Sequence, residues 1–256
     1  MAAPKNEPKI YTGIGLDFET SGLDCVKHAC TQLAMQAVRF DTWEIFDSYV
    51  KYFRPYAKQE IGGAPKRKLL RTKQELNQEE TKLMEYQQEA LTYSGITMDT
   101  LYNQGADLKE IARDVIEFGK RATLTNGRQT KPVLVGQNIT FDIGFVQQLM
   151  CYAGLMKEFE KVFAGSYDFY GNFQPKYIDT IDLGRLAFAN DPTMTSYKLE
   201  LIAERLGIEL DDAHDAGADV TATLNVAIVC SNQLRNNSGT GVNFQRAEKT
   251  RLHFKI

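Results

Sequence analysis

The 256-residue sequence lacks the features that mark membrane-spanning, secreted and strongly basic proteins. It has no apolar run near the roughly 18 residues that a membrane-spanning helix needs, and its first residues, MAAPKNEPK, lack the apolar core of a secretion signal. Its four cysteines are too few and too scattered to form a disulfide framework. The net charge of −3 excludes a histone-like basic coat, although a local basic groove would still allow nucleic-acid binding. We therefore expect a cytoplasmic protein that makes no contact with a membrane.

Length and composition favour a folded chain with one sizeable core. Apolar residues make up 43% of the sequence, so folding can bury enough surface to offset the loss of chain entropy. The sequence shows no internal repeat and no second core. We therefore expect a single domain over residues 1–256, with its core at about 10–235.

The core is predicted to begin with an antiparallel meander. Residues 10–19, 31–40 and 44–53 are rich in aromatic and β-branched residues, and Asp41 and Thr42 form a turn between the second and third segments. From residue 107 the sequence alternates between helical and extended patterns. The predicted strands are 132–136 and 177–181, and the predicted helices are 107–121, 141–154, 183–189, 198–206 and 213–234. A meander followed by alternation predicts an α/β fold with a mixed five-stranded sheet between helices.

A polar segment at about 54–91 interrupts this pattern. Leu69, Leu76, Leu83 and Ala90 recur every seven residues, which predicts a long helical insertion with a narrow apolar seam. Its first turns are basic and its later turns are acidic. Such a helix is either a solvated element that rests on the body or an arm that contacts substrate or a protein partner, such as a polymerase. A polar, mildly basic tail is expected at about 236–256.

Carboxylates gather in three segments, of which two adjoin predicted strands. Asp17 and Glu19 are two residues apart on the first strand, so they point to one face and could share a metal ion. Acidic pairs at strand ends are nevertheless common. Asp142 follows a short buried strand, and sites in α/β sheets form at such strand ends. Asn138 could cap the turn before Asp142.

The third segment surrounds His214 with four aspartates, which are Asp211, Asp212, Asp215 and Asp219. A helix N-terminus favours acidic residues, so capping accounts for the first three. It does not account for Asp219, which lies about a turn and a half into the predicted helix. Spacing alone leaves open whether Asp215 or Asp219 faces the other carboxylates.

In this order the three segments resemble the motifs of the DEDDh (DnaQ-like) superfamily of 3′–5′ exonucleases. That pattern is D-x-E, then N-x-x-F-D, then H-x-A-x-x-D. The sequence has Asp17-Phe18-Glu19, Asn138-Ile139-Thr140-Phe141-Asp142 and His214-Asp215-Ala216-Gly217-Ala218-Asp219. Weaker signatures are Gly95-Ile96-Thr97, Ile178-Asp179-Thr180 and Lys198-Leu199-Glu200. The resemblance runs from about residue 10 to 230 and is greatest to the proofreading (epsilon-subunit-like) and ribonuclease T group. It implies a ribonuclease H-like fold.

The resemblance also implies an enzyme that hydrolyses the terminal phosphodiester of single-stranded or frayed nucleic acid to nucleoside 5′-monophosphates. Four carboxylates would hold two Mg²⁺ or Mn²⁺ ions, namely Asp17, Glu19, Asp142 and Asp219. His214 would act as the general base, and the third motif favours Asp219 over Asp215. The family's contacts to the terminal nucleotide fall on Thr20 and Leu23, with Asn138 and Phe141 as further candidates.

Two other functions remain open. DNA is the favoured substrate, but an RNA 3′-end trimming enzyme of the ribonuclease T type would use the same phosphodiester chemistry. A non-catalytic nucleic-acid-binding module is expected to have lost one of the four carboxylates or the histidine. All five residues are present, which favours an active enzyme.

Overall fold

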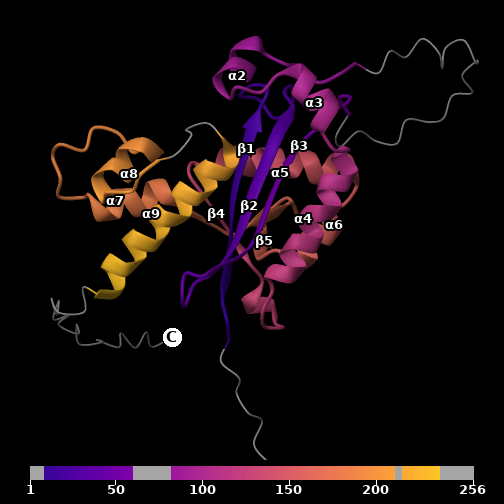
Figure 1. The fold of residues 1–256 in the computed structure, drawn as a ribbon. Coiled ribbons are helices and arrows are strands. Elements are labelled where there is room, and N and C mark those ends of the chain that lie inside the picture. Colours follow the sequence, from indigo (N-terminus) through magenta and orange to yellow (C-terminus); the bar gives the residue numbers. More distant parts are fainter. Residues whose placement is uncertain (1–8, 60–81, 211–214, 237–256) are drawn as a thin grey trace, which may run out of the picture.

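The computed structural model describes residues 9–59, 82–210 and 215–236. At its centre is a five-stranded sheet with the order β3-β2-β1-β4-β7 (Figure 1). Strands β1 (Thr12–Thr20), β2 (Cys30–Arg39) and β3 (Ile45–Tyr52) are antiparallel to their neighbours, whereas β4 (Val133–Gly136) pairs parallel with β1, and β7 (Tyr177–Asp179) pairs parallel with β4. The predicted mixed five-stranded α/β sheet is therefore confirmed.

Helices cover both faces of this sheet. The first face is covered by α4 (Leu108–Ala122), α5 (Ile139–Ala153) and α6 (Met156–Val162). The other face is covered by α9 (Ala216–Asn236), against which α7 (Thr180–Ala187) and α8 (Leu199–Leu206) pack. Figure 1 shows α9 crossing the sheet beside β1 and β2. The sheet thus separates an apolar cluster on the side of α4 and α5 from another on the side of α9.

Several predicted helix ends are confirmed by the local geometry. Asp107 caps α4, because its Oδ1 accepts a hydrogen bond from the Lys109 amide at 2.8 Å. Gly207 ends α8 in the left-handed conformation, with a φ of 70°, which glycine adopts without a steric cost. The predicted last helix begins at Ala216, close to its expected start.

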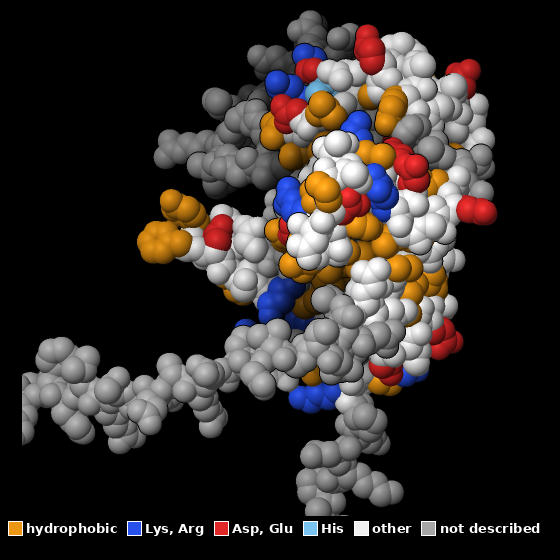
Figure 2. Space-filling model, turned by 90° about the vertical axis from the view of Figure 1, so that its left-hand side faces the viewer, with side chains coloured by type: hydrophobic (Ala, Val, Ile, Leu, Met, Phe, Trp, Pro, Cys, Tyr) orange, Lys and Arg blue, Asp and Glu red, His pale blue; other side chains and the backbone are white. Residues whose placement is uncertain are grey.

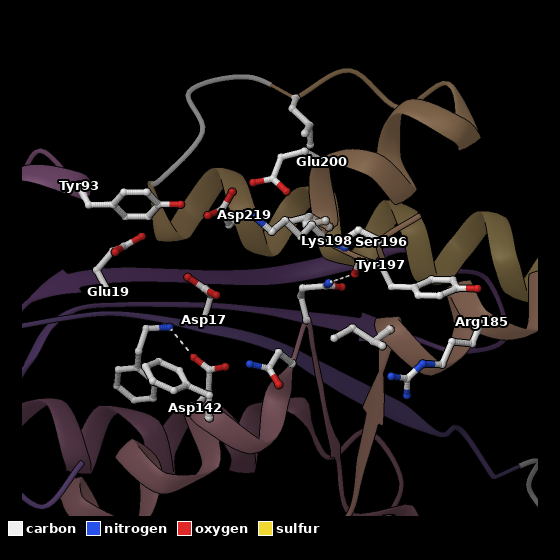
Figure 3. A pocket seen from close by; sticks show the side chains of 17 residues that line it. Asp17, Glu19, Tyr93, Asp142, Arg185, Ser196, Tyr197, Lys198, Glu200 and Asp219 are labelled. Atoms are coloured by element: carbon white, nitrogen blue, oxygen red, sulfur yellow. Dashed lines mark hydrogen bonds between the residues drawn. The ribbon is translucent and has the colours of Figure 1, made fainter. Parts of the chain in front are cut away.

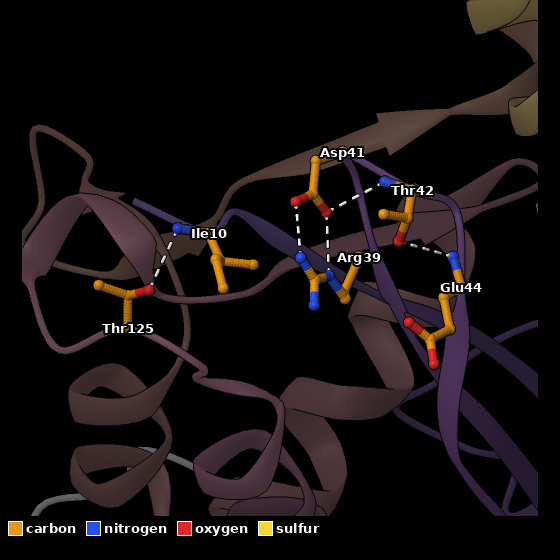
Figure 4. Close-up of polar contacts among 6 residues, drawn as sticks. All are labelled: Ile10, Arg39, Asp41, Thr42, Glu44 and Thr125. Carbon is orange, nitrogen blue, oxygen red and sulfur yellow. Dashed lines mark hydrogen bonds and ion pairs between the residues drawn. The ribbon is translucent and has the colours of Figure 1, made fainter. Parts of the chain in front are cut away.

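The predicted turn between β2 and β3 is closed by its own side chains (Figure 4). The Arg39 guanidinium donates two hydrogen bonds to the Asp41 carboxylate, at 3.0 and 2.7 Å. Asp41 Oδ1 also accepts from the Thr42 amide at 3.0 Å. Beside this turn, the Ile10 amide donates to Thr125 Oγ1 at 3.1 Å and ties the chain that enters β1 to the loop after α4.

The prediction of one long helix over about 54–91 is wrong for residues 82–87, which are extended. Leu83 forms an isolated antiparallel bridge with Ala57, and the Met84 amide donates to the Tyr56 carbonyl at 3.1 Å. These backbone bonds to neighbouring segments take the place of helical ones. Helix α2 (Gln88–Tyr93) begins only after them. The first two leucines of the seam, the basic turns and the tail at 237–256 lie outside the described residues.

The structure also contains elements that the sequence pattern did not predict. They are α3 (Met98–Gln104), α6 and a two-stranded hairpin formed by β5 (Gly165–Tyr167) and β6 (Phe173–Pro175). The hairpin strands have three residues each, which is too short for an alternating pattern to stand out. None of the helices in the described part of the chain is both long and apolar enough to cross a membrane.

Candidate active site

The alternation of β1 directs its side chains to opposite faces of the sheet, as the sequence predicted. Ile14, Leu16 and Phe18 pack against α4 and α5, so Asp17 and Glu19 point to the side of α9. Gly15 lies on that same side, and a β-carbon built on it would lie 2.9 Å from Cγ of Leu224 in α9. The glycine therefore lets α9 approach the strand closely, which brings the first turns of α9 over the carboxylates.

Asp17, Glu19 and Asp219 form one carboxylate cluster at the end of β1 (Figure 3). Each offers a carboxylate oxygen, and these oxygens lie within 4.8 Å of one another. Among the described residues this is the only group of three or more His, Cys, Asp or Glu side chains spaced to hold a metal ion. The three residues come from two elements that are about 200 positions apart in the sequence, so the cluster exists only in the folded chain.

The structure distinguishes Asp219 from Asp215, which the spacing alone did not. The Asp215 carboxylate caps the start of α9, where its Oδ1 accepts from the amides of Gly217 and Ala218 at 3.0 and 3.2 Å. Its other oxygen accepts from the Gln32 side-chain amide at 3.2 Å. Asp215 is thus engaged in capping, and Asp219 joins the cluster. His214, Asp211 and Asp212 lie outside the described residues.

Asp142 stands beside the cluster on the first turn of α5. Its side chain is buried, and Oδ1 accepts a hydrogen bond from the Phe18 amide at 3.0 Å. In Figure 3 its carboxylate lies on the opposite side of Asp17 from Asp219. All four predicted carboxylates therefore line the same cavity, of about 640 Å³.

Crowding makes these carboxylates difficult to ionise together. Burial, followed by the charges of Asp219 and Asp215, raises the pKa of Asp17 from 3.8 to about 7. Burial, followed by the charge of Asp17, raises the pKa of Glu19 from 4.5 to about 8. Burial also raises the pKa of Asp142 well above its ordinary value, with Asp17 as the next cause. A bound cation would favour the ionised forms of all of them. An oxygen-only set of donors fits hard divalent ions such as Mg²⁺ or Mn²⁺.

The four predicted substrate contacts fall into two groups. Asn138 and Phe141 line the cavity, and the Phe141 ring also packs 5.1 Å from that of Phe145. Thr20 ends β1 and Leu23 lies in the loop that follows, and neither is among the cavity residues. Thr20 is buried and its hydroxyl donates to the Gly22 carbonyl at 2.9 Å, whereas Leu23 is 84% exposed.

The capping role considered for Asn138 is wrong. Asn138 adopts the left-handed conformation, with a φ of 52°, and its side chain makes no capping bond. The cap comes from Asp179 at the end of β7, whose two oxygens accept from the amides of Asn138 and Ile139 at 3.1 and 3.2 Å. These two hydrogen bonds connect the carboxyl end of β7 to the segment that follows β4.

Sequence reasoning missed several other residues of the cavity wall. They are Tyr93 from α2, Arg185 from α7, and Ser196, Tyr197, Lys198 and Glu200 at the start of α8. Burial, and then the charges of Glu200, Glu19 and Asp219, raise the pKa of Tyr93. Lys198 and Glu200 belong to a weak signature that the sequence did display. No sequence pattern indicated Tyr93, because it is the last residue of α2, a short helix that the sequence did not distinguish from the predicted long insertion.

The sheet order and the carboxylate cluster define the class of this protein as a ribonuclease H-like α/β fold. The chain belongs to the RNase_T family of exonucleases, whose family model matches residues 73–227, more than half of the chain. The predicted membership in the DEDDh superfamily is thus confirmed. The matched residues include Asp142 and Asp219, whereas Asp17 and Glu19 precede them.

Curated relatives include two exonucleases of staphylococci. The 3′–5′ exonuclease DinG of Staphylococcus epidermidis is 36% identical over 97 residues, which are 38% of this chain and 9% of that protein. DinG of Staphylococcus haemolyticus is 29% identical over 126 residues, which are 49% of this chain and 11% of that protein. The matches therefore span about a tenth of the length of these relatives.

Solved structures of E. coli Exonuclease I share the fold. Its complex with a dT13 oligonucleotide superposes with a TM-score of 0.59 at 21% identity, over 88% of this chain and 42% of that chain. Its complex with a dA16 oligonucleotide gives a TM-score of 0.60 at 20% identity over the same shares. At these identities the likeness concerns the fold alone.

Proposed function

We propose that this chain is a metal-dependent 3′–5′ exonuclease that removes nucleoside 5′-monophosphates from single-stranded or frayed ends, with DNA as the favoured substrate. The observation that carries the proposal is the cluster of Asp17, Glu19 and Asp219 at the end of β1, with Asp142 beside it. Family membership and the name of the staphylococcal relatives support the reaction. The DNA complexes of Exonuclease I, which has the same fold, support DNA.

The cluster would hold two divalent cations through Asp17, Glu19, Asp142 and Asp219. When bound, Mg²⁺ or Mn²⁺ supplies the positive charge that the phosphate oxygens require as the bond breaks. The hydrogen bond from the Phe18 amide keeps the Asp142 carboxylate turned toward Asp17. The capped start of α9 keeps Asp219 over β1. These contacts constrain Asp142 and Asp219 before any ion binds, which limits the reorganisation that catalysis requires.

We assign the proton transfer to His214, which would accept a proton from the attacking water. This assignment is supported by the sequence motif alone, since His214 lies outside the described residues. It precedes Asp219 by five positions, and Asp219 lies in the cluster. Cations held by the carboxylates would disfavour the imidazolium form, which keeps the ring available as a base near neutral pH.

The cavity, whose lining includes Phe141, Asn138, Tyr93 and Lys198, would take the terminal nucleotide. Its volume of about 640 Å³ is in the range of sites for small ligands. A paired terminus would have to unstack before it could enter, so single-stranded or frayed ends are the expected substrate. Leu23, exposed on its loop, is suited to pack beside the last base.

The test is a time course with matched single-stranded DNA and RNA in Mg²⁺, using oligonucleotides labelled at the 5′ end. We expect a ladder of products shortened from the 3′ end, release of nucleoside 5′-monophosphates, and faster loss of DNA. Asp17→Ala is expected to abolish the ladder. Faster loss of RNA would favour the ribonuclease T type of function, and equal, undetectable hydrolysis by both proteins would contradict an enzymatic function.

A further inference from the structure

The β5–β6 hairpin exposes an unusual number of aromatic rings. Phe169 is 96% exposed, Tyr170 is 84% exposed and Tyr167 is 61% exposed, and Tyr177 just beyond the hairpin is 47% exposed. In Figure 2 hydrophobic side chains project from the body of the molecule on the left of the view, where the hairpin lies. Aromatic rings are usually buried because each removes much apolar surface from water. Three exposed rings on one short hairpin, with a fourth just beyond it, therefore suggest a contact surface.

The hairpin is ordered by its own hydrogen bonds. Asp168 Oδ1 accepts from the amides of Tyr170 and Asn172 at 2.9 and 2.8 Å, and its Oδ2 accepts from the side-chain amides of Asn172 and Gln174 at 3.2 Å. Phe173 anchors the hairpin, because it is buried against the Phe159 ring at 6.0 Å. The tip therefore holds the rings outward without needing a partner, so a ligand would bind them at little cost in ordering.

Cations adjoin this hairpin without carboxylate partners. Lys131 and Lys176 precede β4 and β7, and the backbone of their segments is bonded to the start of the hairpin through Ala164, whose amide donates to the Pro132 carbonyl at 2.9 Å. Arg128 and Lys9 lie on the same side, where Lys9 Nζ donates to the Gln129 side chain at 3.0 Å. Within the described part of the chain none of these four cations forms an ion pair.

The pKa of Lys131 reflects its burial and the repulsion between two cations at this surface. Burial, and then the charge of Arg128, lower the pKa of Lys131. Lys131 Nζ donates to the Glu160 backbone carbonyl at 3.0 Å, a neutral acceptor. The Glu160 carboxylate instead accepts from the Tyr167 hydroxyl at 3.0 Å. Two cations held within reach of each other favour the approach of an anion.

We propose that the hairpin rings and these four cations form a second contact for single-stranded nucleic acid, at the end of the sheet opposite to the carboxylate cluster. The carboxylates lie beyond the carboxyl ends of the parallel strands, whereas Lys131 and Lys176 precede the same strands. Aromatic faces that stack bases and cations that neutralise phosphates are the two components of binding to single strands. The rings of Phe169 and Tyr170 meet edge to face, with an angle of 86° between their planes, so their open faces point in different directions.

The contact would hold a long substrate several nucleotides away from its 3′ end. It rests on the proposed function only for the identity of the ligand, because binding there requires neither metal nor cleavage. A long strand would then gain affinity from both ends of the sheet, whereas a short one would reach only the cavity. A protein partner is less consistent with the surface, because it combines a few exposed rings with cations that form no ion pair among the described residues, in place of a continuous apolar patch.

The experiment measures fluorescence anisotropy of 5′-labelled oligo-dT of about 40 and about 6 nucleotides with the Asp17→Ala protein in chelator, so that no cleavage occurs. Each lost base stack is worth about 1–3 kcal/mol, so the double variant Phe169→Ser and Tyr170→Ser is expected to weaken binding of the long strand by at least about tenfold. Binding of the short strand is expected to stay unchanged. Tyr102→Ser, which removes a 51% exposed ring from α3, is the matched control and is expected to change neither.

A second variant tests the cations separately. The triple variant Arg128→Gln, Lys131→Gln and Lys176→Gln is expected to reduce the slope of log affinity against log salt by about 2 for the long strand, since each phosphate contact contributes about 0.7. Unchanged affinity and unchanged slope in both variants would overturn the proposal. A change in oligomeric mass with unchanged nucleic-acid affinity would also overturn it, because the surface would then be a protein contact. Both outcomes are independent of whether the wild-type protein hydrolyses DNA.

Discussion

Gly15 in β1 and Leu224 in α9 lie so close that any side chain at position 15 would force Leu224 to shift. A β-carbon on Gly15 would lie 2.9 Å from Leu224 Cγ and 3.0 and 3.1 Å from its two methyl groups. Asp17 is two residues further along the same face of the strand, and Asp219 is five residues before Leu224 on the helix. The approach of α9 at Gly15 therefore sets the position of Asp219 relative to Asp17.

The first prediction concerns this approach. Gly15→Ala is expected to push α9 away, to cost about 1–3 kcal/mol of stability, and to reduce nuclease activity because Asp219 moves. Adding Leu224→Ala in the same chain restores the space, so the double variant should recover part of the activity. The measurement is kcat together with thermal unfolding for both single variants and the double variant. Strictly additive losses in the double variant would show that the two residues do not set the position of Asp219.

The second prediction is a dependence of stability on pH in the metal-free protein. A carboxylate whose pKa is higher in the folded chain than in the unfolded chain binds more protons when folded, so stability falls as pH rises between the two values. For Asp17 and Glu19 this window runs from the ordinary values of 3.8 and 4.5 to about 7 and about 8. In chelator we therefore expect a lower Tm at pH 8.5 than at pH 5.

Mg²⁺ should raise the Tm at pH 8.5 more than at pH 5, because ions and protons compete for the same carboxylates. Glu19→Gln should raise the metal-free Tm at pH 8.5 and remove part of the response to Mg²⁺. Glu117→Gln, which alters an exposed carboxylate paired with Lys120 at 2.7 Å, is the control and should leave both unchanged. A metal-free Tm that rises between pH 5 and pH 8.5 would contradict the proposed crowding.

The third prediction concerns His214. His214→Ala is expected to leave folding and the stabilisation by Mg²⁺ intact, and to lower kcat by about 10²–10⁴, which is typical for the loss of a general base. The measurement is steady-state hydrolysis of single-stranded DNA, with thermal unfolding in the presence and absence of Mg²⁺. Turnover close to that of the wild type would refute the role assigned to His214.

The fourth prediction tests whether Leu23, and not simply any exposed residue of its loop, contacts the substrate. Leu23→Ala removes an 84% exposed side chain, so stability should stay unchanged while KM for single-stranded DNA rises. Val26→Ala, at a 62% exposed position in the same loop, is the matched control and should leave KM unchanged. Equal KM values for the wild type and Leu23→Ala would show that Leu23 does not contact the substrate.

Local patterns in the sequence were sufficient to predict the sheet, whereas the choice of the four carboxylates also required the order of the three motifs and their resemblance to a family. Alternation along β1 assigned Asp17 and Glu19 to one face, and short apolar runs marked β4 and the strand that precedes α7. The choice between Asp215 and Asp219 required the resemblance to a family, because both lie on the same face of one helix. The structure then showed how they differ. The Asp215 carboxylate accepts hydrogen bonds from the amides at the start of α9, whereas the Asp219 carboxylate lies in the cluster.

The insertion could not be predicted in the same way. A heptad of apolar residues predicted a helix through Leu83, but the backbone at 82–87 bonds instead to Tyr56 and Lys27, far away in the sequence. The cavity residue Tyr93 and the aromatic hairpin were missed for a related reason. Their environment is created by contacts between segments that no local pattern connects.

The most direct test of the central claim compares Asp215, which caps the start of α9, with Asp219, which lies in its first turn. Asp219→Asn removes a proposed metal ligand, whereas Asp215→Asn replaces a helix cap by another good capping residue. The measurement is kcat on single-stranded DNA in saturating Mg²⁺, with thermal unfolding to confirm that both variants fold. The account predicts that Asp219→Asn loses hydrolysis while Asp215→Asn keeps activity close to that of the wild type. Retained activity in Asp219→Asn would contradict it.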